Sequence, residues 1–398
     1  MSIIIDAHVL HAYPLSNLNR DEFGSPKIAF WGGVERSRVS SACIKRGNRK
    51  KVEAVLGDKA LRTRRVPGEV AGELQRRGWN GEEATEAGQA VALAAGVKGL
   101  AIAEAGTTTV MLYLPEAGIS ALADLVEANR ETIAAAAKQA RAEAEAEASK
   151  GAGKKKAPKL DKETARQVKA VQAEVRQVLA SRNASIAAFG RMLANTPEVT
   201  VDGAIAVAPA VTTHATEEQG DFFTAVDDIT GSDNGSAHMG HHAYTSGTFY
   251  GYASIDVGEL RTGLHGDDEA AREFVRAFLA EFAVHVPSAK KNSTAPFTPP
   301  ALVHFTVRTD QPVSLAGAFE APVVADDASG WTAPSLEALN QHAAAITGFY
   351  GTTSVVTSAH AGTAPTLNTV TALGKHVPGI SDLVEEITTA AFNEAGQQ

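Results

Sequence analysis

Apolar residues occupy every second position from Ile3 to Val9. This period of two is typical of a β-strand with one buried face, so a strand is predicted over 2–10. A second short strand, polar on one face, is predicted over 34–39. A helix is predicted over 42–56, because a serine cap precedes a run with helical spacing.

The pattern changes after residue 66. Residues 67–195 are rich in Ala, Glu and Arg, and long helices are predicted over 122–148 and 163–193. A glycine-broken loop between these helices is rich in lysine, and its lysines include Lys154, Lys155, Lys156 and Lys159. Such a loop is either a solvated linker, which the sequence alone favours, or a weak contact for a nucleic acid. Strand-like sequence resumes afterwards, so this unit is predicted to be an insertion.

The remainder of the chain alternates strands and helices. Strands are predicted over 204–213, 248–256, 302–308 and 313–319, and helices over 267–282, 336–348 and 381–395. This order predicts an α+β fold, with a small antiparallel sheet and helices on one face. A ferredoxin-like or RRM-like strand order would suit it, although the pattern does not determine that order.

Charge distribution changes the functional picture more than composition does. The single cysteine, Cys43, excludes an internal disulfide framework, and there is no leader-like or membrane-spanning apolar run, which predicts a soluble, cytoplasmic protein without a membrane partner. The net charge is −9, yet residues 1–65 hold 13 basic and 6 acidic residues. Residues 36–51 hold seven basic residues and no acidic one. Phosphates respond to local potential, so this stretch predicts a nucleic-acid contact, or alternatively a solvated helix face.

The spacing within 36–51 favours phosphate binding. Arg36 and Arg38 are two apart on a predicted strand and should share a face. Ser40 and Ser41 stand at a helix start, where free amides and the helix dipole attract anions. Two ridges of residues four apart continue along the helix: Lys45 with Arg49, and Arg46 with Lys50. None of these groups is placed to read bases, so binding should tolerate any sequence.

The segment 214–247 is predicted to be a long polar loop, and loops of this length are usually functional or disordered. Phe222 and Phe223 within it either pack against the core or wedge between bases of a single strand. The segment also holds His214, His238, His241 and His242 near Asp227 and Asp228. Their spacing matches no known metal signature, so neither a metal nor another cofactor is predicted. The alternative is a metal-dependent ribonuclease that uses His238, His241 and His242 with Asp227 and Asp228.

Several motifs, in order along the chain, resemble one known family. They are Leu18-Asn19-Arg20-Asp21, Gly32-Gly33, Arg38-Val39-Ser40-Ser41, Lys45-Arg46, Leu61-Arg62-Thr63, Gly190-Arg191-Met192, Thr212-Thr213-His214, Phe223-Thr224-Ala225-Val226-Asp227-Asp228, Gly235-Ser236-Ala237-His238, Ser246-Gly247-Thr248-Phe249-Tyr250 and Val286-Pro287-Ser288-Ala289-Lys290. The chain resembles the CasC-type backbone subunit of the type I-E CRISPR complex Cascade. The resemblance implies an RRM-like palm (1–66, 196–213 and 248–398), inserted helical fingers (67–195) and a β-hairpin thumb (214–247).

The resemblance also implies a role without catalysis. Copies of such a subunit stack along one CRISPR guide RNA, hold its phosphates and displace bases at intervals, so that the guide can pair with target DNA. Other expected partners are the large, small, guide-capping and guide-processing subunits. The implied RNA contacts are Arg20, Lys27, Arg36, Arg38, Ser40, Ser41, Lys45, Arg46, Arg49, Gly190, Arg191, Met192, Phe222, Phe223, Thr224, His238 and Met239. Lys154, Lys155, Lys156 and Lys159 are implied to face DNA. Members of the family commonly carry Trp at the position of Phe222.

Overall fold

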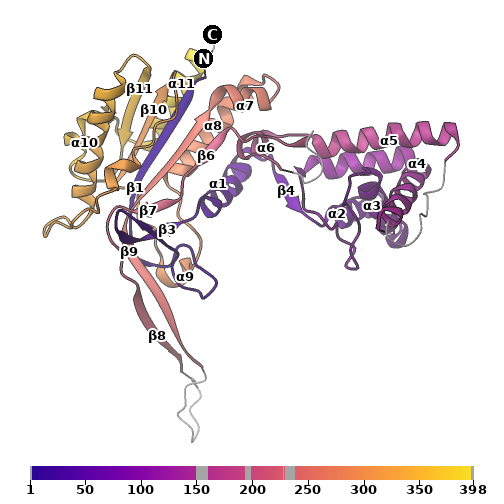
Figure 1. Ribbon diagram of the computed structural model, residues 1–398, viewed down its shortest axis with the longest axis horizontal. Coiled ribbons are helices and arrows are strands. Elements are labelled where there is room, and N and C mark those ends of the chain that lie inside the picture. The colour runs from indigo at the N-terminus through magenta and orange to yellow at the C-terminus, as the bar shows by residue number, and fades with distance from the viewer. Residues whose placement is uncertain (1, 149–159, 193–198, 227, 229–237, 396–398) are drawn as a thin grey trace, which may run out of the picture. The chain divides into compact units, whose positions relative to one another are not determined.

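The computed structural model describes residues 2–148, 160–192, 199–226, 228 and 238–395. The chain forms two compact units, shown in Figure 1. The first unit combines Met1–Leu56 with Ala204–Gln398, and the second is Gly57–Gly203. The sequence analysis set the corresponding boundaries at 66/67 and 195/196. The second unit is therefore an insertion in the chain of the first.

A mixed sheet organises the first unit. Its strands run in the order β12-β11-β10-β1-β9-β7-β3-β2, and β6 and β8 also pair with β9. The bounds are β1 (Ile4–Ser16), β2 (Ile28–Trp31), β3 (Val34–Val39), β6 (Ile205–Val207), β7 (Ala210–Thr212), β8 (Gln219–Ala225), β9 (His238–Asp256), β10 (Leu302–Arg308), β11 (Val355–Ala361) and β12 (Lys375–His376). All pairs are antiparallel except β11 with β12.

The helices of this unit cover both faces of the sheet. They are α1 (Ser41–Leu56), α7 (Val257–Gly263), α8 (Asp268–Ala283), α9 (Lys291–Thr294), α10 (Thr332–Tyr350) and α11 (Ile380–Ala395), with short 3-10 turns η2 (Ala316–Phe319), η3 (Leu367–Thr369) and η4 (Thr371–Leu373). Val9 of β1 faces α1 and α8, because it lines one cavity with Ile44 and Phe282. Leu10, the next residue, packs with Leu336 of α10. The prediction of a small sheet with helices on one face was therefore wrong, whereas the mixed α+β class is confirmed.

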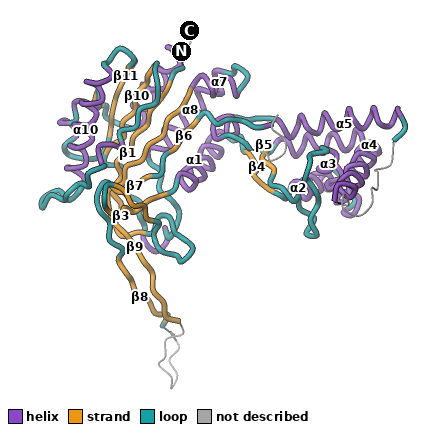
Figure 2. Tube along the Cα trace, in the orientation of Figure 1, coloured by secondary structure: helices purple, strands orange, loops and turns teal. Residues whose placement is uncertain are grey.

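The hairpin of β8 and β9 continues the sheet beyond its helical cover, as Figure 2 shows. Gln219 pairs with Tyr244 at its base, and Ala225 pairs with His238 at the end of the described ladder. The sequence analysis treated 214–247 as a loop because its Gly, His and Asp residues lack strand propensity. Pairing with β8 satisfies the backbone groups of β9 in spite of that composition.

The second unit is mostly helical. Its elements are β4 (Ala60–Thr63), α2 (Val66–Arg76), α3 (Gly81–Ala94), β5 (Leu112–Pro115), α4 (Ala117–Ala148), α5 (Lys162–Ala180) and α6 (Ala184–Phe189). Its core is built from aliphatic residues, among them Leu74, Leu114, Leu122 and Val175, each fully buried. The α5 periodicity places Val168, Val171, Val175 and Leu179 on this core.

Two predicted elements have different structures. A single helix over 163–193 was wrong, because the Asn183 side chain accepts a hydrogen bond from the Ile186 amide and starts a new helix, α6. A strand over 313–319 was also wrong. There the Val313 amide donates to Asp6 Oδ2 and the Leu315 amide donates to the Tyr250 hydroxyl. Bonds to side chains replace those of a sheet ladder.

Candidate nucleic-acid interface

The start of α1 is built by two polar side chains. Ser40 precedes the helix, and its Oγ accepts a hydrogen bond from the Cys43 amide at 3.4 Å. Asn19 Oδ1 accepts a hydrogen bond from the Ser40 amide at 2.9 Å, which ties the loop after β1 to this helix end. The segment that holds Arg20 is therefore fixed beside the positive end of the α1 dipole.

An open hollow of about 690 Å³ lies at this place. Arg20, Cys43, Ser288 and Lys290 are among the residues that line it, together with two acidic residues, Asp21 and Glu22. Burial raises the pKa of the Cys43 thiol, while the charges of Lys27 and Arg46 oppose that rise. Those two cations therefore lie within electrostatic reach of the same hollow. We call the set Arg20, Lys27, Arg46 and Lys290 the basic hollow.

Three other predicted cations of α1 and β3 have protein partners. Lys45 Nζ donates to the Ile205 carbonyl at 3.1 Å, and Arg49 forms an ion pair with Glu53 at 3.0 Å. Arg38 Nε donates to the Ile28 carbonyl at 3.0 Å. These three side chains are partly buried, so the exposed positive surface of this region lies with Arg20, Arg46, Lys50 and Lys51, of which Lys51 pairs with Glu281.

Arg36 was predicted to contact RNA, and the structure corrects this prediction. Its side chain is fully buried, and its guanidinium donates to the carbonyls of Trp31, Thr212 and Phe319. It also lies 5.2 Å from the centre of the Trp31 ring. Five fixed donors suit a site where several carbonyls converge. Arg36 therefore joins β2, β3, β7 and the η2 segment within the fold, and no phosphate can reach it in this structure.

The hairpin presents two different faces. Strand alternation puts Phe222, Thr224, Met239 and His241 on one face, since Phe222 is opposite His241 and Thr224 is opposite Met239. Phe222 is 56% exposed and Met239 is 62% exposed. We call these four residues the exposed hairpin face; an aromatic ring and a thioether there offer a surface on which a base can stack.

Phe223 lies on the opposite face and packs within the hairpin. Its ring stacks on His242 with centroids 4.4 Å apart and an interplanar angle of 12°. A Cβ at Gly240 would lie within 3 Å of the Phe223 ring, so glycine is required beneath it. The His242 ring in turn meets Lys290 Nζ at 3.0 Å. Lys290 thus connects the basic hollow to the base of the hairpin.

The comparisons with known proteins agree with one another. The profile of a family described as CT1975-like protein matches residues 5–386. The chain belongs to the CT1975-like family. Two solved structures are also similar to it, while among curated proteins none matches. One, titled "CRISPR RNA-guided surveillance complex, pre-nicking", is 38% identical with a TM-score of 0.82, and the alignment covers 98% of this chain and 100% of the other.

The second structure is titled "CRISPR RNA-guided surveillance complex" and is 32% identical. Its TM-score is 0.72, with 97% of this chain and 99% of the other covered. These similarities support a role for this CT1975-like chain in CRISPR defence. No helix among the described residues is long and apolar enough to cross a membrane.

Arg191 of this CT1975-like chain is the second predicted RNA contact that the structure does not place at the surface. It is 4% exposed, and burial lowers its pKa to about 10. Its guanidinium donates to carbonyls around the end of α5, those of Tyr113, Leu179, Ala180, Ser181 and Val199. It therefore caps α5 instead of facing a ligand. Gly190 adopts φ 79° and packs against Gly203, while the neighbouring Met192 is 88% exposed. Of this motif, only Met192 offers its side chain to a partner.

The predicted histidine cluster does not converge. His241 lies on the exposed hairpin face, whereas His238 and His242 lie on the other. His214 is buried and stacks on Trp331 with centroids 3.7 Å apart. Within the described part of the chain, no group of three metal-ligating side chains is placed to hold an ion. Asp227 and Lys154, Lys155, Lys156 and Lys159 lie outside the described residues.

The roles of Lys290 and His242 are not indicated by the sequence. Lys290 stood in a motif of the resemblance without an assigned function, and His242 was considered only as a metal ligand. Their contact joins residues 48 positions apart, so no local spacing indicates it. The signal that was available is the run 286–290 itself, which departs from both helical and strand periodicity.

Proposed function

We propose that this chain is a non-catalytic backbone subunit of a type I-E CRISPR surveillance complex, similar to CasC of Cascade. In this proposal the first unit is the palm, the second unit is the fingers and the β8–β9 hairpin is the thumb. The observation that carries the proposal is the contact of Lys290 with His242, because it ties the basic hollow to the base of the hairpin that bears the exposed hairpin face.

The proposed mechanism divides the work between the basic hollow and the exposed hairpin face. The basic hollow neutralises phosphates of the guide RNA, which supplies affinity without reading sequence. The exposed hairpin face stacks against a displaced base and its neighbours. Sequence reading is then left to pairing between the guide and target DNA, as in other guided systems. Further copies of this chain and the other Cascade subunits are the proposed protein partners.

The salt dependence of RNA binding tests the phosphate contacts. The variant Arg20→Met with Arg46→Met removes two charges and keeps most of the side-chain volume. We expect its affinity for a guide-length single-stranded RNA to fall equally for all sequences. The slope of log affinity against log salt should flatten by about 1.4, since each phosphate contact on a single strand contributes about 0.7. Filter binding over a salt series measures both quantities.

The matched control is Arg276→Met with Lys375→Met. These cations are in the same unit and already pair with Glu385 and Glu386, so the control changes net charge equally. We expect it to keep the original slope. Equal flattening in both variants would reduce the effect to net charge and refute the basic hollow. Cleavage of labelled RNA with divalent metal, lost in Asp228→Ala, would contradict the non-catalytic role.

A further inference from the structure

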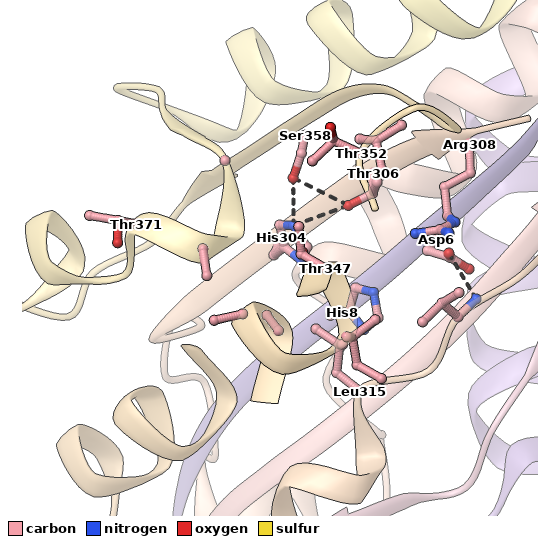
Figure 3. A pocket seen from close by; sticks show the side chains of 17 residues that line it. Asp6, His8, His304, Thr306, Arg308, Leu315, Thr347, Thr352, Ser358 and Thr371 are labelled. Atoms are coloured by element: carbon pink, nitrogen blue, oxygen red, sulfur yellow. Dashed lines mark hydrogen bonds between the residues drawn. The ribbon is translucent and has the colours of Figure 1, made fainter. Parts of the chain in front are cut away.

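A cavity of about 470 Å³ lies between the sheet and α10, far along the strands from the residues assigned above. Its floor is the face of β1, β10 and β11, and its roof includes Ala343, Ala344 and Thr347 of α10 (Figure 3). Small side chains on the roof leave space that larger residues would fill. The volume falls in the range of pockets that take small organic ligands.

The strand register gives the floor two polar rows. Asp6, Thr306 and Ser358 lie opposite one another on the three strands. His8 lies opposite His304 in the next row, and their rings are stacked with centroids 5.1 Å apart. The Ser358 and Thr306 hydroxyls both contact His304 Nε2, at 3.0 Å and 3.1 Å, as the dashed lines in Figure 3 show. The floor therefore combines aromatic faces with hydrogen-bonding groups.

Several polar atoms of this floor have unused bonding capacity. His304 Nδ1 is buried and has no hydrogen-bond partner among the described residues. His8 Nδ1 bonds to the Tyr250 hydroxyl at 2.8 Å, and no described residue bonds to His8 Nε2. Arg308 uses Nε and Nη2 for Asp310, and its Nη1 likewise has no hydrogen bond within the described parts of the chain. His304 Nδ1 is the buried one of these three atoms, and all three retain capacity to hydrogen-bond a ligand that enters the cavity.

The charges of the cavity exclude an anionic ligand. Arg308 is balanced by Asp310 at 2.7 Å, and Asp6 adds a second carboxylate. Burial raises the pKa of Asp6 to about 6, against the opposing effect of its bond from Tyr252, so Asp6 is still ionised above neutral pH. The three charges together are negative. A ligand without negative charge that offers donors to Asp6 and acceptors to Arg308 is the best match.

We propose that this cavity binds a nucleobase. A base is planar and uncharged, so it can lie against the row of Tyr252, His8 and His304 rings under the small residues of α10. Its edge carries both donors and acceptors, which match the Asp6 carboxylate and the Arg308 guanidinium. This site is separate from the basic hollow, and it does not depend on the guide-binding role. A free nucleoside and the terminal base of a strand share this chemistry.

Titration calorimetry of the full chain with adenosine, guanosine, cytidine and uridine tests the proposal. We expect saturable binding of at least one nucleoside and none of ribose or inorganic phosphate. Saturation should also shift the imidazole NMR signals of His8 and His304. A tetranucleotide with and without its terminal base distinguishes the sources, since only binding lost with the base assigns the site to a strand end.

The variant Ala344→Phe fills the cavity from its solvent side. We expect it to weaken nucleoside binding at least about tenfold, which corresponds to about 1.4 kcal/mol. The matched control is Ala345→Phe, because Ala345 is the next exposed residue of α10 and does not line the cavity. Absence of saturable binding up to about 10 mM for every nucleoside would overturn the proposal. So would binding of ribose alone, or equal losses in both variants.

Discussion

The interior of the first unit and its basic hollow use the same residue types in opposite ways. In the interior, Arg36 is fully buried and its charge is met by four carbonyls from three segments of the chain. In the hollow, Arg20 and Arg46 are exposed at the edge of an open space. Buried imidazoles such as His304 are likewise part of the fold, whereas His241 is on the exposed hairpin face.

This difference shows why local charge density cannot identify a binding surface by itself. Arg36 and Arg46 belong to the same basic stretch, yet only Arg46 is available to a phosphate. A buried cation stabilises the fold through hydrogen bonds that cannot be replaced by water. An exposed cation adds little to stability and is free to bind a ligand. The two classes are therefore separable by experiment.

Lowering the pH should give the largest difference in stability effect between buried and exposed side chains. Burial lowers the pKa of His11 and His285 to about 4 and that of His304 to about 3, from 6.5. The unfolded chain therefore binds more protons between pH 6.5 and 4, and stability falls as the pH falls through this window. At about pH 5, each of these three imidazoles should lower the free energy of unfolding by about 2 kcal/mol. The raised pKa of Asp6 acts in the opposite direction and should increase the free energy of unfolding by about 1 kcal/mol.

Urea unfolding at about pH 7.5 and pH 5 measures this change, expected to be about 5 kcal/mol from these four groups. Tryptophan fluorescence in a Trp79→Phe background reports on the first unit alone, because Trp31 and Trp331 are both in it. His304→Gln should reduce the pH dependence by about 2 kcal/mol, and the exposed His265→Gln should not change it. Equal stability at the two pH values would show that the imidazoles are not buried.

Replacing the two arginines should produce the next largest difference. Arg36→Met leaves the Trp31, Thr212 and Phe319 carbonyls without their donor, so we expect a loss of about 3 kcal/mol in the same unfolding assay. Arg46→Met should change stability by less than about 0.5 kcal/mol, because this side chain is exposed. Similar values for both variants would remove the distinction between interior and surface arginines.

The sequence predicted the helices and strands well. It predicted poorly which individual side chains are buried. The helices α1, α8, α10 and α11 follow clear periodicity, and each was predicted to within a few residues. The position of Arg36 depends on β7 and η2, which are separated from it by more than 170 residues. Neither spacing nor charge carries such non-local information. The exposed positions of Arg20 and Arg46 agree with the local charge excess, although no local pattern separates them from Arg36.

Phe222 and Phe223 are neighbours in sequence and also differ in exposure, and the effects expected from replacing them are the smallest. Phe223→Ala removes the stack on His242, so we expect the hairpin amides to exchange about tenfold faster, a change of about 1.4 kcal/mol. Phe222→Ala should leave exchange nearly unchanged, because that ring is half exposed. Hydrogen exchange by mass spectrometry resolves the segment 219–225. RNA binding should respond in the reverse order, with Phe222→Ala reducing affinity through lost stacking at an unchanged salt slope.

The contact between Lys290 and His242 adds a third variant to the comparison of Phe222→Ala with Phe223→Ala. Loosening the hairpin by Phe223→Ala also weakens its connection to the basic hollow, so that variant lowers RNA affinity only through the hairpin's disorder. Lys290→Met should reproduce the faster exchange near His242 and also flatten the salt slope, because it removes both the contact and a cation. Faster exchange in Phe222→Ala than in Phe223→Ala would reverse the two faces of the hairpin and contradict the stacking role assigned to Phe222.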